Sequence, residues 1–336
     1  SNQRYFPLYD AQGKLTNHFV LVSNGDPARN DVIAQGNERV VRARLSDAKF
    51  FYEEDLKHPL EAYVAKLATV GFQEKLGTVF SKTERIETIA KSVCEQAGVA
   101  GQDEADSLRA AHLCKADLIT GAVVEFTSLQ GVMGGHYARY SGETEQVAEA
   151  ITDHYRPRFS GDEVPSNIAG KVVALSDKMD TICGIFAAGM GPTGSSDPYA
   201  LRRAALGILS ILESGVRVSI PALIDVALDA YAAQGIEFDR AAIRSQVVDF
   251  FITRTKVMLK DAGNGADAID AVLAAGIEEP MELVSRVEAL EKARKEDSES
   301  FANLAIAFAR ANNLRDEAEG ADYDDASLTE VQHALS

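Results

Sequence analysis

Five basic side chains between positions 156 and 203 are the groups in this sequence best suited to bind a phosphate-rich partner. An arginine guanidinium donates two parallel hydrogen bonds to phosphate oxygens, and a lysine supplies a compact positive charge. We therefore predict a contact with RNA at these residues, which are Arg156, Arg158, Lys171, Arg202 and Arg203.

The same basic residues have an alternative role inside the protein. Asp162 and Glu163 lie in the same segment, DHYRPRFSGDEVPS, and Asp177 follows it, so the arginines could pair with carboxylates of the chain itself. Neighbouring positions of a helix point about 100° apart. One of Arg202 and Arg203 is therefore expected to anchor its helix while the other faces outward. The sequence leaves both interpretations of the basic residues open.

The sequence carries no motif of a self-contained catalytic centre. No glycine-rich phosphate loop follows a predicted strand, and there is no nucleophile elbow and no Walker-type lysine. His136 and His154 lack a carboxylate at the third or fourth following position, where a ligand pattern would place it. The cysteines Cys94, Cys114 and Cys183 form no CxxC pair, which argues against a zinc site or a disulfide scaffold and is typical of a reducing compartment. We expect this chain to have no catalytic residue and to bind no metal or cofactor.

Composition limits the functions that the chain can have. It has 336 residues, of which 46% are hydrophobic, so it can bury a substantial core and is not a disordered chain. No stretch approaches the ~20 apolar residues of a membrane span. The formal net charge of −17 argues against a nonspecific nucleic-acid binder. Any contact with RNA must therefore come from local basic patches on an acidic protein.

The elements that position these residues are predicted to be mainly helical. Strands at 4–9 and 18–23 flank a turn signal and form a β-hairpin. Ser81-Lys-Thr-Glu84 is typical of a capping box, and Asp197-Pro198 of a helix start. An acidic loop is expected over 317–325 and a helix over 328–335. Helices are predicted from about 31, over 60–76, 81–97 and 103–119, over 121–140, 143–155, 168–186 and 198–214, and over 221–233, 238–260, 267–275, 280–295 and 298–313.

The stretch from Gly121 to Gly215 is unusually rich in glycine, and its members include Gly134, Gly135 and Gly184. Glycine inside a helix costs about 1 kcal/mol relative to alanine. These glycines therefore need a compensating reason, such as close packing of helices or the approach of a ligand backbone.

Several long segments resemble the β subunit of the bacterial two-subunit glycyl-tRNA synthetase. QGVMGGHYARYSGE, HYRPRFSGDEVPSN, ALSDKMDTICGIF and DPYALRRAALGIL are similar to the central region of that subunit. QRYFPLYDAQGKL and GNERVVRARLSDAKFFYEEDLK are similar to its upstream part. The resemblance runs in order from about position 3 to about position 315. Ser1-Asn2 resembles a cloning scar, and we expect the chain to be an excised fragment.

The resemblance implies a function in translation. The chain would be the tRNA-recognition subunit of a cytoplasmic glycine–tRNA ligase, acting with an α subunit in an α2β2 heterotetramer. ATP, Mg²⁺ and glycine would bind to the α subunit, which would charge tRNA(Gly), and this fragment would be inactive alone. A helical scaffold with no role in RNA binding is a further hypothesis, favoured only by the acidic charge.

The helix order from 81 to 215 resembles the HD superfamily, whose phosphohydrolases hold a metal through a histidine, a His-Asp pair and a later aspartate. Matched by position, the ligands would be Lys82, Cys114, Lys115 and Asp177. A lysine ammonium has no lone pair for a cation. The resemblance thus implies a dismantled site in which Asp177 pairs with the two lysines. His112, one turn before the pair, is interpreted as a buried, hydrogen-bonded core histidine.

The fold class predicted is mainly α: an HD-like helical bundle with a small N-terminal β-hairpin and further C-terminal helices. The expected parts are the end of an upstream α+β region with connecting helices (1–78), the HD-like core (79–215), a helical extension (216–316) and the truncated start of an anticodon-binding domain (317–336). The alternative function is that of a metal-dependent nucleotide phosphohydrolase, which the lysines at the ligand positions argue against.

Overall fold

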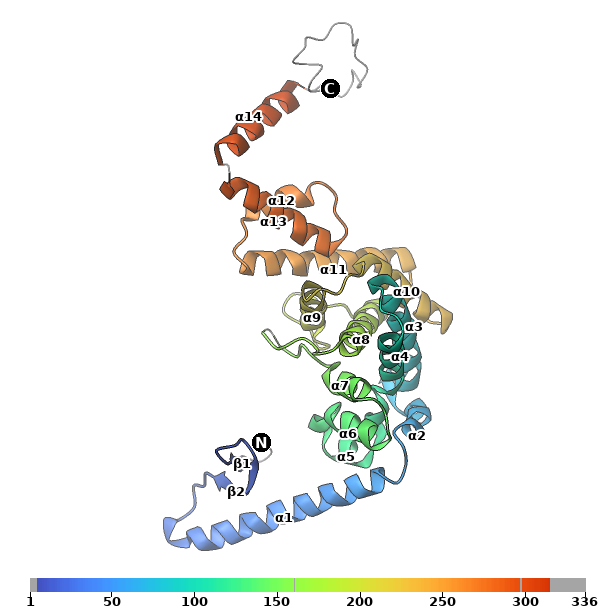
Figure 1. Cartoon of the computed structure of the whole chain (residues 1–336), viewed down its shortest axis with the longest axis vertical. Helices are drawn as coiled ribbons and strands as arrows, with labels where there is room; N and C mark the ends of the chain where they lie inside the picture. Colours follow the sequence, from blue (N-terminus) through green and yellow to red (C-terminus); the bar gives the residue numbers. More distant parts are fainter. Residues whose placement is uncertain (1–4, 160, 297, 315–336) are drawn as a thin grey trace.

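Residues 5–159, 161–296 and 298–314 are described by the computed structural model, and most of them are helical. The predicted mainly α fold is confirmed. The molecule is elongated, with a hairpin and α1 at one end, α14 at the other and a packed body between them (Figure 1). The helices are α1 (Asn30–Asp55), α2 (Glu61–Val64), α3 (Val79–Ala97), α4 (Gln102–Leu113), α5 (Gly121–Glu125), α6 (Val132–Tyr140), α7 (Glu145–Asp153), α8 (Ile168–Ala187), α9 (Leu201–Glu213), α10 (Ile220–Ala233), α11 (Arg240–Asp261), α12 (Ala266–Leu273), α13 (Pro280–Glu296) and α14 (Ser298–Leu314).

The N-terminal hairpin is present as predicted. Strand β1 (Tyr5–Tyr9) pairs antiparallel with β2 (Leu15–Leu21), so the second strand begins three residues earlier than expected. The Asp10 carboxylate accepts from the backbone N–H groups of Gln12 and Lys14, which closes the turn between the strands. The hairpin is followed by the long helix α1, most of whose residues are exposed.

Helix α8 is the centre of the body, because it packs against α3, α4, α7, α9, α10 and α11. Nearly all of its residues are buried, and its long apolar run is therefore explained by contact on every side. The close approach of its neighbours uses glycine: a Cβ added at Gly184 would lie 2.0 Å from the Tyr231 hydroxyl of α10. Helix packing, the first of the two predicted reasons, thus explains this glycine.

Three predicted helices are wrong in extent. Residues 60–76 form α2, a 3₁₀ turn (Ala65–Thr69) and strand β3 (Gly71–Gln73), which pairs with β4 (Gly77–Thr78). Residues 103–119 divide into α4 and a 3₁₀ turn (Ala116–Ile119), and residues 121–140 into α5, a 3₁₀ turn (Thr127–Leu129) and α6. Gly77, directly after the first segment, and Gly131, before α6, adopt positive φ angles of 82° and 79°, which glycine tolerates without steric cost.

The break before α6 is stabilised by a buried carboxylate. Asp117 Oδ2 accepts from the backbone N–H groups of Gly131 (2.6 Å) and Gly134 (2.9 Å), at the start of α6. Asp55, at the end of α1, caps α5 in the same way through the N–H groups of Gly121 and Ala122. Side chains distant in sequence therefore decide where these helices begin.

The two predicted helix starts are also corrected. Helix α3 begins at Val79, and its cap is Thr78, whose side chain accepts from the Ser81 N–H group at 3.2 Å; Ser81 is not the cap. Helix α9 begins at Leu201 rather than directly after Asp197. The Asp197 carboxylate still accepts from the first N–H groups of this helix, those of Leu201 and Arg202, but across an intervening turn.

Helices α12 and α13 enclose a second, smaller core with the end of α11. Its buried members include Leu259, Ile269 and Leu283. The predicted acidic loop and final helix at 317–335 lie outside the described residues. The domain boundaries and the HD-like assignment stay predictions, since the element order alone does not test them.

Candidate RNA-binding surface and buried charge cluster

Lys82, Lys115 and Asp177 come together in the interior. Lys82 lies on α3, Lys115 directly after α4, and Asp177 in the middle of α8. Lys82 Nζ is 2.9 Å from Asp177 Oδ1, and Lys115 Nζ is 2.8 Å from Asp177 Oδ2. The Asp177 carboxylate thus lies between two ammonium groups. It joins α3 and α8 to the end of α4.

A second carboxylate extends this cluster. Asp180, one turn further along α8, is 2.8 Å from Lys82 Nζ and 2.6 Å from Arg85 Nε. The Arg85 guanidinium also lies over the Tyr231 ring, 4.0 Å from its centroid. Arg85 was not predicted from the sequence as a member of the cluster. The spacing in the sequence could have identified it. Lys82 and Arg85 are one turn apart on one helix, as Asp177 and Asp180 are on the other.

Burial and charge fix the protonation of the cluster. Burial alone would raise the pKa of the Asp177 carboxyl, but Lys115 and Lys82 outweigh it and hold that pKa well below its usual value. Burial opposes the charge of Lys115, yet Asp177 raises the pKa of the ammonium. Burial, reinforced by Lys115, lowers the pKa of His154. His154 is therefore neutral, with Nε2 accepting from Lys115 (2.8 Å) and Nδ1 donating to the Ile151 carbonyl (2.7 Å).

The arrangement suits a structural role better than metal binding. Positive side chains face both oxygens of Asp177, where a metal would need lone pairs. The Cys114 thiol is buried and donates to the Ala111 carbonyl, and burial raises its pKa to about 12. In the described part of the chain, no three His, Cys, Asp or Glu side chains converge in a way that could hold a metal ion.

Two of the predicted phosphate-binding arginines are paired inside the protein. Arg156 lies 3.1 Å from Glu163 Oε2, and Arg158 lies 3.4 Å from Asp162 Oδ2. Both pairs belong to the loop between α7 and α8, and both are at least partly exposed to solvent. The internal-pairing interpretation of these two residues therefore has direct contacts in the structure.

The other three basic residues differ among themselves. Arg202 donates to the Gly194 carbonyl at 2.6 Å and so holds the loop before α9. Arg203, its neighbour, is exposed. Within the described residues, neither Arg203 nor Lys171 has an ion-pair partner within 4 Å. The split between an anchoring and an outward arginine is thus observed at 202 and 203.

The segment 164–212 forms α8, the following loop and α9 up to Leu212, and leaves no carboxylate of its own free at the surface; Glu213, the last residue of α9, is exposed. Its acidic residues are Asp177, Asp180 and Asp197. The first two are buried in the charge cluster. The third uses both oxygens on the N–H groups that begin α9. In a chain of net charge −17, this segment presents cations at its surface without competing anions.

The histidines differ from the expectation. His112 is hydrogen-bonded, as predicted, but it is not buried: its side chain is 30% exposed and lies between Glu87 (2.7 Å) and Glu61 (2.9 Å). The hydrogen bond to Glu87, opposed by burial and reinforced by Glu61, raises the pKa of His112 to about 9. His136 is exposed, whereas His154 belongs to the buried cluster.

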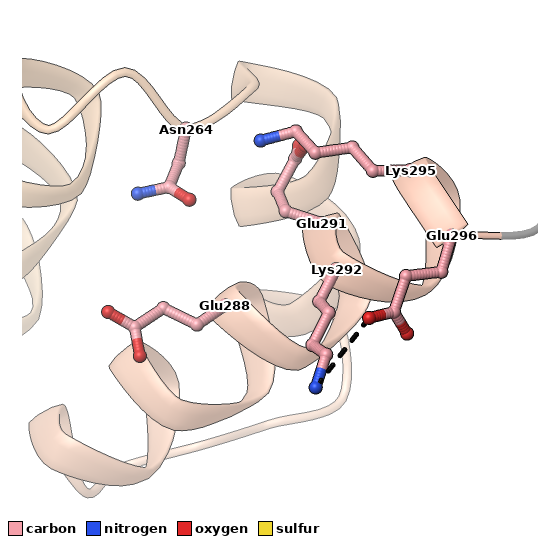
Figure 2. A pocket seen from close by; sticks show the side chains of 6 residues that line it. All are labelled: Asn264, Glu288, Glu291, Lys292, Lys295 and Glu296. Carbon is pink, nitrogen blue, oxygen red and sulfur yellow. Dashed lines mark ion pairs between the residues drawn. The ribbon is translucent and has the colours of Figure 1, made fainter.

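A surface pocket at the C-terminal end is mainly acidic, whereas the surface of the segment 164–212 (the α8–α9 surface) is basic. Figure 2 shows Glu288, Glu291 and Glu296 beside Lys292 and Lys295 at its rim. Lys292 pairs with Glu296 at 3.7 Å. The carboxylates outnumber the ammonium groups, so this pocket is a poor place for a phosphate.

The chain is similar to known proteins over almost its whole length. The family model described as glycyl-tRNA synthetase beta subunit matches residues 1–274. The "Glycine--tRNA ligase beta subunit" of Clostridioides difficile (strain 630) is 46% identical over 330 residues, covering 98% of this chain and 47% of that protein. The proteins of the same description from Desulforamulus reducens and from Haemophilus influenzae (strain ATCC 51907) are 46% and 45% identical, over 93% of this chain and 45% and 44% of theirs.

The chain belongs to the glycyl-tRNA synthetase β subunit family. The resemblance predicted from the sequence segments is thereby confirmed. The chain spans less than half the length of the curated relatives it matches. Across the residues that the structure describes, no helix combines the length and apolarity needed to span a bilayer.

Proposed function

We propose that the chain is the tRNA-recognition part of a glycine–tRNA ligase β subunit. In this proposal it supports the ATP-dependent charging of tRNA(Gly) by an α subunit, within an α2β2 heterotetramer in the cytoplasm. ATP, Mg²⁺ and glycine bind to the α subunit, and this chain supplies surface for the RNA. The names of the relatives support the ligase, and the electrostatics of the body support the contact with RNA.

The observation that carries the proposal is the surface of the segment 164–212, which has no free carboxylate of its own. RNA binding depends on neutralising phosphates, and a nearby free carboxylate would repel them. Lys171 and Arg203 belong to this segment, and neither has an ion-pair partner among the described residues. Arg202 acts differently, because it holds the loop through the Gly194 carbonyl. Arg156 and Arg158 must exchange Glu163 and Asp162 for phosphate, so we expect smaller contributions from them.

The experiment compares Arg203, which has no ion-pair partner among the described residues, with the ion-paired Arg158. Binding of tRNA(Gly) to the chain is measured over a range of salt concentrations for wild type, Arg203→Gln and the matched control Arg158→Gln. We expect Arg203→Gln to weaken binding and to lower the salt slope by about one unit, since one phosphate contact is lost. The control should change both quantities less. Equal affinity and slope in all three proteins would contradict the proposed surface.

The role in charging needs a second measurement. We expect the complete subunit containing this chain to co-purify with a glycyl-tRNA synthetase α subunit and to be required for glycylation of tRNA(Gly). Full glycylation by the α subunit alone would overturn that part of the proposal. The phosphohydrolase alternative receives no support, because Lys82 and Lys115 occupy the positions that would need metal ligands.

A further inference from the structure

A small notch lies where the end of α3, the beginning of α8 and the turn after α9 meet. Its volume is about 240 Å³. Lys171 and Arg217 contribute its charged side chains, and the latter was not singled out by the sequence analysis. Its remaining lining comes from Ala97, Ile168, Ser214, Gly215 and Val216.

The charges of this notch are unbalanced in favour of an anion. Its lining contains two cationic side chains and no carboxylate. Neither Lys171 nor Arg217 has an ion-pair partner within 4 Å among the described residues, although 24 ion pairs occur there.

Two other clefts in the described part of the chain differ from the notch in this respect. The pocket of Figure 2 has three glutamates against two lysines. The larger cleft beside the notch, of about 860 Å³, shares Arg217 with it but is lined by Glu213, Glu279 and Glu282. An anion is therefore attracted to the notch and repelled from the adjoining cleft.

The backbone supports the same preference. Ile168, in the lining, is the first residue of the 20-residue helix α8. The N-terminal end of a helix carries partial positive charge on its free N–H groups. Lys171 and Arg217 line the same notch as Ile168. The oxygens of a phosphate can accept hydrogen bonds from an arginine, from a lysine and from backbone N–H groups.

We propose that the Lys171–Arg217 notch binds a backbone phosphate of the RNA that the α8–α9 surface faces. The inference rests on the proposed function, because it takes tRNA as the source of the phosphate. It goes further in naming the ligand group, the cavity and Arg217. A free phosphate or a nucleotide has the same chemistry, and the experiment separates these sources from RNA.

The test uses residues 1–336 and the double variant Lys171→Gln/Arg217→Gln. The control is Lys260→Gln, which removes an exposed lysine of α11 that has no ion pair in the described chain. Affinity for tRNA(Gly) is measured against salt concentration, and inorganic phosphate is titrated as a competitor. Lys171→Arg, which retains the charge, serves as a rescue variant, and the melting temperature of each protein reports its folding.

We expect the double variant to bind tRNA about tenfold more weakly at low salt, with a salt slope smaller by about one unit and an unchanged melting temperature. Lys260→Gln and Lys171→Arg should bind like wild type. Unchanged affinity and slope in the double variant would overturn the notch while leaving the proposed tRNA surface standing. Binding of inorganic phosphate that depends on both residues, with tRNA binding unaffected, would assign the notch to a small ligand and overturn the RNA proposal. Complete absence of tRNA binding by wild type would overturn both.

Discussion

Lys115 and Asp177 form the ion pair on which the interior of the body depends. The Lys115 ammonium lies 2.8 Å from Asp177 Oδ2, and the same nitrogen is 2.8 Å from His154 Nε2. Lys115 also lies over the Tyr155 ring, 4.2 Å from its centroid. A buried ammonium with a carboxylate, an imidazole and an aromatic face around it is fully compensated. Removing the Asp177 carboxylate therefore leaves the buried ammonium without its counter-charge.

Replacing Asp177 by alanine should destabilise the protein strongly. The variant leaves the buried ammonium groups of Lys82 and Lys115 without their shared carboxylate, at a cost of about 3–5 kcal/mol of unfolding free energy. Chemical denaturation of the purified protein measures this change. Glu53→Ala breaks the exposed pair with Lys49 and serves as control, with an expected loss of less than about 1 kcal/mol. Similar stabilities of the two variants would show that the central ion pair is not structural.

The contribution of His112 should depend on pH. The partners Glu87 and Glu61 raise its pKa from 6.5 to about 9, so the folded state binds the proton more tightly than the unfolded state. The stabilisation is fully present below pH 6.5 and is lost as pH rises through about 9. We expect His112→Gln to lose about 1–2 kcal/mol near pH 6 and much less near pH 10. Urea unfolding of both proteins at the two pH values is the measurement, and a pH-independent difference would contradict the prediction.

Two glycine-to-alanine substitutions should act in opposite directions. The methyl group of Gly184→Ala would lie 2.0 Å from the Tyr231 hydroxyl and 3.0 Å from Leu76, so overpacking should cost about 1–3 kcal/mol. Gly36→Ala is the matched control in the exposed helix α1, where an added Cβ meets nothing within 4 Å. It should stabilise the protein by up to about 1 kcal/mol through helix propensity. Thermal unfolding distinguishes the two, and a neutral Gly184→Ala would refute the close-packing explanation.

Residues 1–336 alone should not activate glycine. The sequence has no phosphate loop and no nucleophile motif, and the proposed ATP site is on the α subunit. We expect no glycine-dependent exchange of pyrophosphate into ATP by the purified chain, at any concentration of glycine. The α subunit with the complete β subunit is the positive control. Exchange above background by this chain alone would place an adenylation site within it.

The sequence by itself determined the fold class and the family. Helical periodicity and the turn between the two strands depend on local chemistry, and the structure has the hairpin and most of the helices where they were predicted. The family followed from long, ordered segments whose resemblance does not require knowledge of contacts. The contact of Lys82 and Lys115 with Asp177 was inferred from the resemblance of the helix order to the HD superfamily, and the distances agree with it.

Only the tertiary structure decided which charges are free. Arg202 and Arg203 are adjacent and chemically identical, but only the first reaches a carbonyl partner, because that partner is in the folded loop at Gly194. Arg217 gained significance only when α3, α8 and the turn after α9 met around one cavity. Likewise, α5 and α6 begin where Asp55 and Asp117 supply caps from other parts of the chain. Electrostatic contacts across long sequence separations leave no periodic pattern, so packing alone decides which cations remain available to RNA.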